Sequence, residues 1–447
     1  MGDFVILRLG FGLWAGLGWA RPCRAGLLMT GLSVRAMIGT YSALALALFA
    51  YLYLPLLASR QQLDPSAVAE LVNESLLPLN KGLHADNRHV VAIVTGSTNG
   101  IGRELAGQLY GLGLTVIVAS RNADKCDRVI KELTSEHPES KGALRKGVID
   151  TGDLESVAAF SREFIASKSP LHMLVLNAGI HYASTELAGG RPAMDPAVPA
   201  LSPQNYDLAF STNYLGHFLL AKLLVPALQA SGPGTRLLHV SSSYHFQSDG
   251  TMLVAASGAT PLAARGDVNT AQHRGQSYAN NKLAQVLHAK ELQRRLDQTS
   301  SSSNSLIATS FCPGWVDTGI IPNNPGGNAL RLLAFNAKAA TIGLLGGLLS
   351  RRVRGGEFVS IFRNLVTTQA WCADVLALVT RLGVREATVH ALAAFILFTE
   401  GASYGFTVAP SSPESHDERL ARDLFDWSDR AVAPFAASAS ASASASG

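Results

Sequence analysis

Two residues four positions apart, Tyr278 and Lys282, could do acid–base chemistry together. On a helix this spacing places the phenol and the ammonium group on one face. A free tyrosine has a pKa of about 10, too high for efficient proton transfer at neutral pH, and a nearby cation lowers that pKa by favouring the phenolate. The spacing alone is weak evidence, because an exposed helix face accounts for most pairs of this kind.

Small and polar groups follow three apolar runs elsewhere in the chain. They are Asn177-Ala178-Gly179 after residues 171–176, Ser241-Ser242-Ser243 after residues 235–240, and Cys312-Pro313-Gly314 after residues 305–311. The carboxyl ends of parallel strands meet at one edge of a sheet, where α/β proteins bind their ligands. A serine cluster is also typical of a turn. Several such strand ends in one chain nevertheless predict a shared site.

A glycine-rich turn precedes all of these groups. The segment Thr95-Gly96-Ser97-Thr98-Asn99-Gly100-Ile101-Gly102 stands between the apolar run 90–94 and a helical pattern over 101–112. Glycine lets the backbone come close to a diphosphate, and a helix N-terminus offers unpaired N–H groups and a positive dipole end. The spacing is G-x-x-x-G-x-G, which differs from the common G-x-G-x-x-G fingerprint. We expect a phosphate site here, with an ordinary strand–turn–helix junction as the alternative.

Apolar runs alternate with helical patterns over most of the chain. The predicted strands cover 90–94, 115–119, 144–149, 171–176, 235–240 and 305–311, and the predicted helices 101–112, 124–136, 153–167, 206–230, 277–296 and 418–432. This alternation implies a parallel sheet with right-handed crossovers. The predicted fold class is therefore α/β, a doubly wound Rossmann-type parallel sheet.

The end of the second predicted strand bears on the coenzyme. An acidic residue there would bind the adenosine ribose of NAD, but the sequence continues Ser120-Arg121-Asn122. Arg121 is placed to meet a 2′-phosphate, although a solvated loop arginine is the alternative. The coenzyme predicted from this position is NADP(H).

The N-terminal residues predict a membrane anchor. Residues 36–58 carry no charge and are long enough to cross a bilayer as a helix, so that a buried core helix is the weaker interpretation. Residues 1–35 form a basic segment that suits targeting, and 59–87 a linker. We expect a membrane location, the endoplasmic reticulum first and a mitochondrial or chloroplast membrane as the alternative.

Composition excludes other function classes. The net charge of +4 is mild, and no basic stripe is interleaved with aromatic residues, so nucleic acid is not an expected partner. The four cysteines are widely scattered without a C-x-x-C pair, which predicts no metal site and no disulfide framework.

Taken together, the motifs resemble those of the short-chain dehydrogenase/reductases. TGSTNGIG, NAG, SSS, YANNK and PGWVDT occur in the order typical of that family, and the resemblance covers residues 88–432. Segments 211–220, 240–245 and 313–318 resemble the retinol-dehydrogenase-like branch, whose members are often membrane-anchored and act on lipophilic alcohols and carbonyls.

The resemblance implies a role for each matching residue. Tyr278 would be the proton donor or acceptor, Lys282 would lower its pKa and bind the nicotinamide ribose, and Ser242 would hold the substrate oxygen. Asn213 would carry a water-linked proton relay. The implied cofactor-binding residues are Gly96, Ser97, Asn99, Gly100, Ile101, Gly102, Arg121, Asp150, Asn177, Ala178, Gly179, Tyr278, Lys282, Pro313, Gly314, Val316 and Thr318.

Three segments depart from the family pattern: 185–200, 244–276 and 319–385. The last is expected to form an extended substrate lid, with apolar patterns over 330–349 and 365–382 and an arginine cluster at Arg351, Arg352 and Arg354 that suits anionic headgroups. A homodimer interface is the alternative for these apolar patterns. The Ala/Ser tail, 433–447, is expected to be disordered.

The sequence thus predicts a membrane-anchored oxidoreductase that transfers hydride between NADP(H) and a lipophilic alcohol or carbonyl, such as a retinoid, steroid or polyprenol. Its expected partners are a lipophilic small molecule, a membrane and a second copy of the chain. The alternative is an NADP(H)-binding redox-sensing scaffold in an organelle membrane complex, with little turnover.

Overall fold

The computed structural model of the chain describes residues 90–181, 201–254, 259–265, 271–299, 306–314, 316–319, 334, 336–360 and 407–444. The predicted targeting segment, membrane helix and linker (1–87) lie outside these residues. So do the insertion 185–200 and the apolar pattern 365–382.

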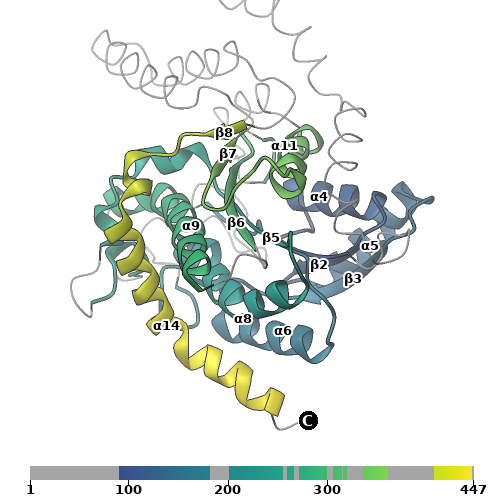
Figure 1. Cartoon of the computed structure of the whole chain (residues 1–447), viewed down its shortest axis with the longest axis horizontal. Coiled ribbons are helices and arrows are strands. Elements are labelled where there is room, and N and C mark those ends of the chain that lie inside the picture. The colour runs from purple at the N-terminus through teal and green to yellow at the C-terminus, as the bar shows by residue number, and fades with distance from the viewer. Residues whose placement is uncertain are drawn as a thin grey trace, which may run out of the picture. The chain divides into compact units, whose positions relative to one another are not determined.

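Eight strands form one sheet in the order β3-β2-β1-β4-β5-β6-β7-β8 (Figure 1). The strands are β1 (Val91–Thr95), β2 (Thr115–Ser120), β3 (Ala143–Val148), β4 (Met173–Leu176), β5 (Arg236–Val240), β6 (Ile307–Cys312), β7 (Phe358–Ser360) and β8 (Thr407–Ala409). Every neighbouring pair is parallel except β7 and β8, which are antiparallel. The strand order reverses between β1 and β4, so their carboxyl ends form the switch point where such sheets bind ligands.

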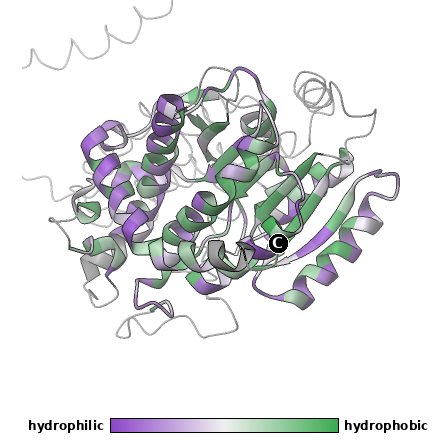
Figure 2. Cartoon of the chain, turned by 60° about the horizontal axis from the view of Figure 1, so that its bottom comes forward, coloured by the Kyte–Doolittle hydropathy of each residue, from purple (hydrophilic) through white to green (hydrophobic). Residues whose placement is uncertain are grey.

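Helices cover both faces of this sheet. On one face α4 (Gly100–Gly111) contacts α5 (Ala123–Glu136) and α11 (Ala337–Leu349). On the other, α6 (Leu154–Ala166) and α9 (Ala271–Thr299) lie with α8 (Gly216–Ala230), and α14 (Glu418–Ser444) packs over all three. Figure 2 shows hydrophobic and hydrophilic stripes alternating around these helices. The doubly wound parallel sheet is therefore confirmed.

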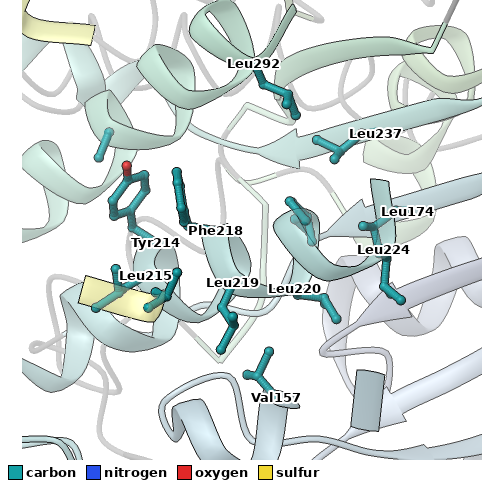
Figure 3. Close-up of a cluster of buried hydrophobic side chains, with 14 of the residues drawn as sticks. Val157, Leu174, Tyr214, Leu215, Phe218, Leu219, Leu220, Leu224, Leu237 and Leu292 are labelled. Carbon is teal, nitrogen blue, oxygen red and sulfur yellow. The ribbon is translucent and has the colours of Figure 1, made fainter. Parts of the chain in front are cut away.

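The continuous helix Leu208–Ala230 is the centre of the larger core. It combines α7 (Leu208–Phe210), a π-helical turn η2 (Ser211–Leu215) and α8. Figure 3 shows its apolar side chains between α6 and strands β4 and β5. Among the described residues this is the one helix long and apolar enough to cross a membrane, but 78% of its apolar window is buried within the fold. The apolar character of this helix is therefore explained by its burial within the fold.

The lid expected over 319–385 stays a prediction, and its described central part belongs to the packed fold. Residues 337–349 form α11, which packs against α4 and the sheet, with Leu344, Leu345 and Leu348 at most 1% exposed. The arginine cluster lies in the turn between α11 and β7. Because a turn from a helix into a parallel strand lies at the amino edge of the sheet, this cluster is remote from the ligand-binding edge. The apolar pattern arises from a sheet crossover rather than from membrane contact.

The tail also differs from the disordered segment that we expected. Helix α14 continues to Ser444, through most of the alternating Ala and Ser residues. Phe435 and Ala436 pack against the core cluster, which fixes the helix where the low-complexity sequence begins. Alanine is the best helix former, and serine costs only about 0.5 kcal/mol per residue relative to it, so the repeat extends a helix that packing has already started.

The position of α11 predicts a large stability effect. Leu344 is fully buried, so Leu344→Ala should lower the free energy of unfolding by about 2–5 kcal/mol. Leu262→Ala is the matched control, since that side chain is 43% exposed and its loss should cost well under about 1 kcal/mol. Urea denaturation of the full chain, followed by tryptophan fluorescence, measures both. Equal, small losses would mean that α11 is not part of the core.

Candidate active site

The glycine turn between β1 and α4 is built for close backbone approach. Gly96 and Gly100 have φ of +69° and +55°, which favours glycine at both positions. A Cβ at Gly102 would lie 2.5 Å from Asn177 Nδ2 and 2.6 Å from the carbonyl oxygen of Gly96. A Cβ at Gly96 would lie 2.9 Å from the Cα of Ala178. The turn therefore packs directly on the residues that follow β4.

Thr95 fastens this contact. Its Oγ1 accepts hydrogen bonds from the backbone N–H groups of Asn177 (2.9 Å) and Ala178 (3.0 Å). The Asn177 side chain donates in return to the Thr95 carbonyl oxygen at 2.9 Å. On its other side Thr95 Oγ1 lies 2.9 Å from Nε2 of His217, whose pKa burial lowers to about 4. One hydroxyl thus joins the ends of β1 and β4 to α8.

Other cofactor-binding candidates belong to this turn or follow strands β4 and β6. Asn99 caps α4 through a hydrogen bond from Gly100 N to its Oδ1, and Ser97 Oγ accepts from Ala119 N of β2 at 2.8 Å. Thr318 contacts the turn, since a Cβ at Gly100 would lie 2.9 Å from its Cγ2. Ile101 and Gly179 are partly buried, Val316 is buried, and Pro313 and Gly314 follow β6 directly.

Two candidates from the resemblance lie at the ends of β2 and β3. Arg121 follows Ser120, the last residue of β2, and is exposed. The carboxylate of Asp150 accepts a hydrogen bond from Gly152 N at 2.9 Å, so it also shapes the turn after β3. Their contacts with a coenzyme stay predictions.

Ser242 and Tyr278 converge although 35 residues separate them. Ser242 is the second residue after β5 and caps the short helix η3 (Ser243–Gln247). Burial raises the pKa of Tyr278, and the Ser242 side chain partly opposes that shift, which places the two side chains together. The neighbouring Ser241 is buried and donates to the carbonyl oxygen of Lys282 at 2.9 Å, so it fastens β5 to α9. Of the three serines, Ser242 is the one that faces the phenol.

Lys282 lies beside Tyr278 but does not point at its hydroxyl. Its Nζ is 5.3 Å from the centre of the Tyr278 ring and donates to the Val240 carbonyl oxygen at 2.8 Å and to Gln285 Oε1 at 3.2 Å. Burial lowers the pKa of Lys282 to about 7. Burial, with Tyr244 and Cys312 nearby, raises the pKa of Tyr278, which is opposite to the direction that the Tyr–Lys spacing predicts. Loss of solvation therefore outweighs the neighbouring cation in this structure.

Asn213 occupies the π-helical turn η2. Its side-chain amide accepts from Ile180 N at 2.8 Å and donates to the Ile180 carbonyl oxygen at 2.9 Å. Its own carbonyl oxygen accepts from Gln285 Nε2 at 2.7 Å. π-Turns of this kind are frequent at functional sites. The structure brings Asn213 to Lys282 through Gln285, and the water-linked relay stays a prediction.

Several residues at this site were not among the sequence candidates. The rings of His181 and Tyr244 stand edge-on to Tyr278, with centroid distances of 4.7 and 5.6 Å. Burial, and next the charge of Lys282, lower the pKa of His181. Gln285 is the third, and its position three residues after Lys282 was the one signal in the sequence. Cys312, which the sequence placed only at a strand end, accepts from Ser243 N through Sγ at 3.2 Å.

The geometry fits a dinucleotide coenzyme. The glycine cradle is a surface that a Cβ would fill, and the first turn of α4 holds no acidic residue that would repel a diphosphate. The phenol, hydroxyl and ammonium groups of Tyr278, Ser242 and Lys282 belong to the same edge of the sheet. This arrangement can bind a coenzyme and move a proton at an oxygen atom beside it.

Gly102→Ala should abolish dinucleotide binding, because its Cβ would collide with Asn177 and with the backbone of Gly96. Gly319→Ala is the matched control, as its Cβ would meet only Asn99 Nδ2 at 3.6 Å, an ordinary contact. Quenching of protein fluorescence by NADPH and NADH measures binding to both variants. Unchanged affinity in Gly102→Ala would show that the turn is not the diphosphate site.

Comparison with known proteins agrees with this geometry. The family described as short chain dehydrogenase matches residues 90–260. Polyprenol dehydrogenase from Mus musculus is 36% identical over 233 residues, 51% of this chain and 60% of that protein. Polyprenol dehydrogenase from Homo sapiens is 32% identical over 277 residues, 61% of this chain and 71% of that protein.

A second kind of relative points to the same family. Retinol dehydrogenase 11 from Mus musculus is 30% identical over 223 residues, 48% of this chain and 60% of that protein. The chain thus spans between 60% and 71% of the length of these three relatives. The chain belongs to the short-chain dehydrogenase/reductase family, in its retinol-dehydrogenase-like branch.

Proposed function

We propose that the chain is an oxidoreductase that transfers hydride between a nicotinamide coenzyme and a lipophilic alcohol or carbonyl. The observation that carries this proposal is the convergence of Ser242 and Lys282 on Tyr278: the Ser242 side chain influences the pKa of the phenol, and the buried Lys282 Nζ lies 5.3 Å from the centre of the phenol ring. A structural serine–tyrosine pair would need neither the buried ammonium group nor the glycine turn at the same edge.

The residues of the chain handle the proton and the oxygen. The nicotinamide supplies or accepts the hydride when bound. In carbonyl reduction Tyr278 donates its phenolic proton to the oxygen that gains negative charge, and Ser242 donates a hydrogen bond to the same oxygen. In alcohol oxidation the Tyr278 phenolate accepts the hydroxyl proton. Burial raises the pKa of Tyr278, so the phenol carries at neutral pH the proton that carbonyl reduction requires.

Lipophilic substrates fit the surroundings of Tyr278 and the names of the relatives. His181 and Tyr244 provide aromatic walls, and Tyr244, in the segment after Ser242, is itself 36% exposed. The relatives are named for polyprenol and for retinol, both lipophilic alcohols. We extend this substrate class to the chain, with retinoids, steroids and polyprenols as members.

A membrane location and an NADP(H) preference complete the proposal. The uncharged residues 36–58 would anchor the chain, in our view at the endoplasmic reticulum, and a long-chain alcohol dissolves in the same bilayer. Exposed Arg121 at the end of β2 supports NADP(H), since the strand end offers no carboxylate for a ribose hydroxyl.

Removing the phenolic hydroxyl tests the chemistry. Tyr278→Phe should keep coenzyme binding and reduce turnover of long-chain alcohols and aldehydes at least 10²-fold, the lower end of general acid–base contributions. Tyr206→Phe is the control, because that ring contacts Trp427 on α14. NADPH absorbance over a panel of retinoid, steroid and polyprenol substrates measures the rates. Normal turnover by Tyr278→Phe would refute the mechanism, and no turnover by the native chain, with coenzyme bound, would favour the redox-sensing scaffold.

Coenzyme preference is tested separately at Arg121. Arg121→Ala should weaken NADPH binding about 10- to 100-fold and NADH binding much less, since a hydrogen bond to a charged group is worth about 1.5–3 kcal/mol. Arg128→Ala, an exposed arginine of α5, is the control. Titration of both coenzymes against the three proteins decides the point. Equal losses for NADPH and NADH would refute the 2′-phosphate contact.

A further inference from the structure

We propose that Gln285 is a positioning residue that holds the Lys282 ammonium group and ties it to the carbonyl oxygen of Asn213. Its catalytic meaning rests on the proposed function, whereas its effect on Lys282 does not.

The geometry makes Gln285 a bridge. Its Oε1 accepts from Lys282 Nζ at 3.2 Å, and its Nε2 donates to the Asn213 carbonyl oxygen at 2.7 Å. The side chain is fully buried, so no solvent competes for either bond. An amide has its acceptor and its donor at opposite corners, and both partners here demand one orientation. An apolar side chain of the same size could satisfy neither partner.

The ammonium group needs this acceptor because it is buried without an anionic partner. No carboxylate of the described residues forms an ion pair with Lys282, whose pKa burial lowers to about 7. The thiol of Cys312 on β6 is the titratable group that acts on the pKa of Lys282. The charge of Lys282 in turn lowers the pKa values of His181, His217 and His239, which lie near it. Tyr278 lies beside it on its own helix. The oxygens that accept its hydrogen bonds, those of Val240 and Gln285, are neutral.

The π-helical turn η2 supplies the other end of the bridge. The Asn213 carbonyl oxygen lies 3.1 Å from His217 Nδ1 and accepts the Gln285 amide as well. Through this oxygen Gln285 connects α9 to the turn whose side chain holds Ile180, next to the Asn177-Ala178-Gly179 strand end. Gln285 thereby fixes Lys282 relative to the strand end after β4, and not only relative to helix α9.

A matched control exists on the same helix. Gln293, two turns further along α9, is also buried; its Oε1 accepts from Ala308 N at 2.8 Å and its Nε2 donates to Asp297 at 2.8 Å. It supports the backbone of β6, and its hydrogen bonds go to Ala308 and Asp297, not to Lys282 or Tyr278. Gln293→Leu therefore removes a buried glutamine without touching the ammonium group.

The test is the titration of Lys282 in the full chain, carrying ¹³C-labelled lysine, by NMR. The Lys282 signal is assigned by its loss in Lys282→Met. Gln285→Leu should lower the pKa of Lys282 by about one pH unit, because a hydrogen bond to the charged form is removed. Gln285→Glu keeps the size and an acceptor, and should raise that pKa above the native value. Gln293→Leu should leave it unchanged.

Two outcomes overturn the proposal. One is a pKa of Lys282 in Gln285→Leu that equals the pKa in the native chain. The other is a pKa shift in Gln293→Leu as large as the shift in Gln285→Leu. Gln285→Glu keeps the test open if the leucine variant does not fold, since an unshifted pKa there also contradicts the bridge.

The rate profile provides the link to function. In Gln285→Leu the alkaline limb of kcat/KM for carbonyl reduction should move to lower pH by the same amount as the Lys282 titration. If Gln285→Leu shifts the pKa of Lys282 but the native chain shows no turnover, the proposed function is refuted and the role of Gln285 stands. If the native chain is active but Gln285→Leu leaves the pKa of Lys282 unchanged, the role of Gln285 is refuted and the proposed function stands.

Discussion

The contact between the glycine turn and the end of β4 is the constraint on which the rest of the site depends. Gly96 and Gly102 bring the turn so close to Asn177 and Ala178 that no Cβ fits between them. Thr95 then locks the two strand ends with hydrogen bonds to both backbone N–H groups. Because β1 and β4 flank the point where the strand order reverses, this contact lies where a coenzyme would bind in a sheet of this kind. The other strand ends that carry candidate residues belong to the same edge of the sheet.

Electrostatics at this site are governed by burial more than by pairing. Lys282 loses part of its charge at neutral pH, and Tyr278 holds its proton more tightly than a free phenol does. The acceptors that surround Lys282 are neutral oxygens, so the ammonium group is oriented without being neutralised. Because Lys282 is only 4% exposed, little solvent screens the interaction between its ammonium group and any charge that a bound coenzyme brings. The described site therefore holds a protonated phenol beside an ammonium group whose hydrogen-bond acceptors are neutral.

The segments that looked unusual in the sequence have ordinary roles in the described fold. The apolar pattern over 337–349 is the crossover helix between β6 and β7, and the arginine cluster after it lies at the far edge of the sheet. The Ala/Ser repeat extends a helix that covers α6, α8 and α9. These assignments remove the described part of the supposed lid as a means of substrate access. Structural support for a lipophilic substrate comes instead from the aromatic rings of His181 and Tyr244, which contact Tyr278.

The sequence by itself determined the alternation of strands and helices, the glycine turn and the chemical groups at the strand ends. Each of these depends on local features of the chain: the spacing of hydrophobic residues, the residues that favour turns, and the chemical type of single residues. It also identified Tyr278, Lys282, Ser242 and Asn213, through a motif order that resembles one family. Only the tertiary structure decided that Ser242, and not Ser241, faces Tyr278, and that Gln285 connects Lys282 to Asn213. The direction of the Tyr278 pKa likewise follows from burial. Solvation and contact between distant segments are properties of the packed chain, and no spacing along the sequence specifies them.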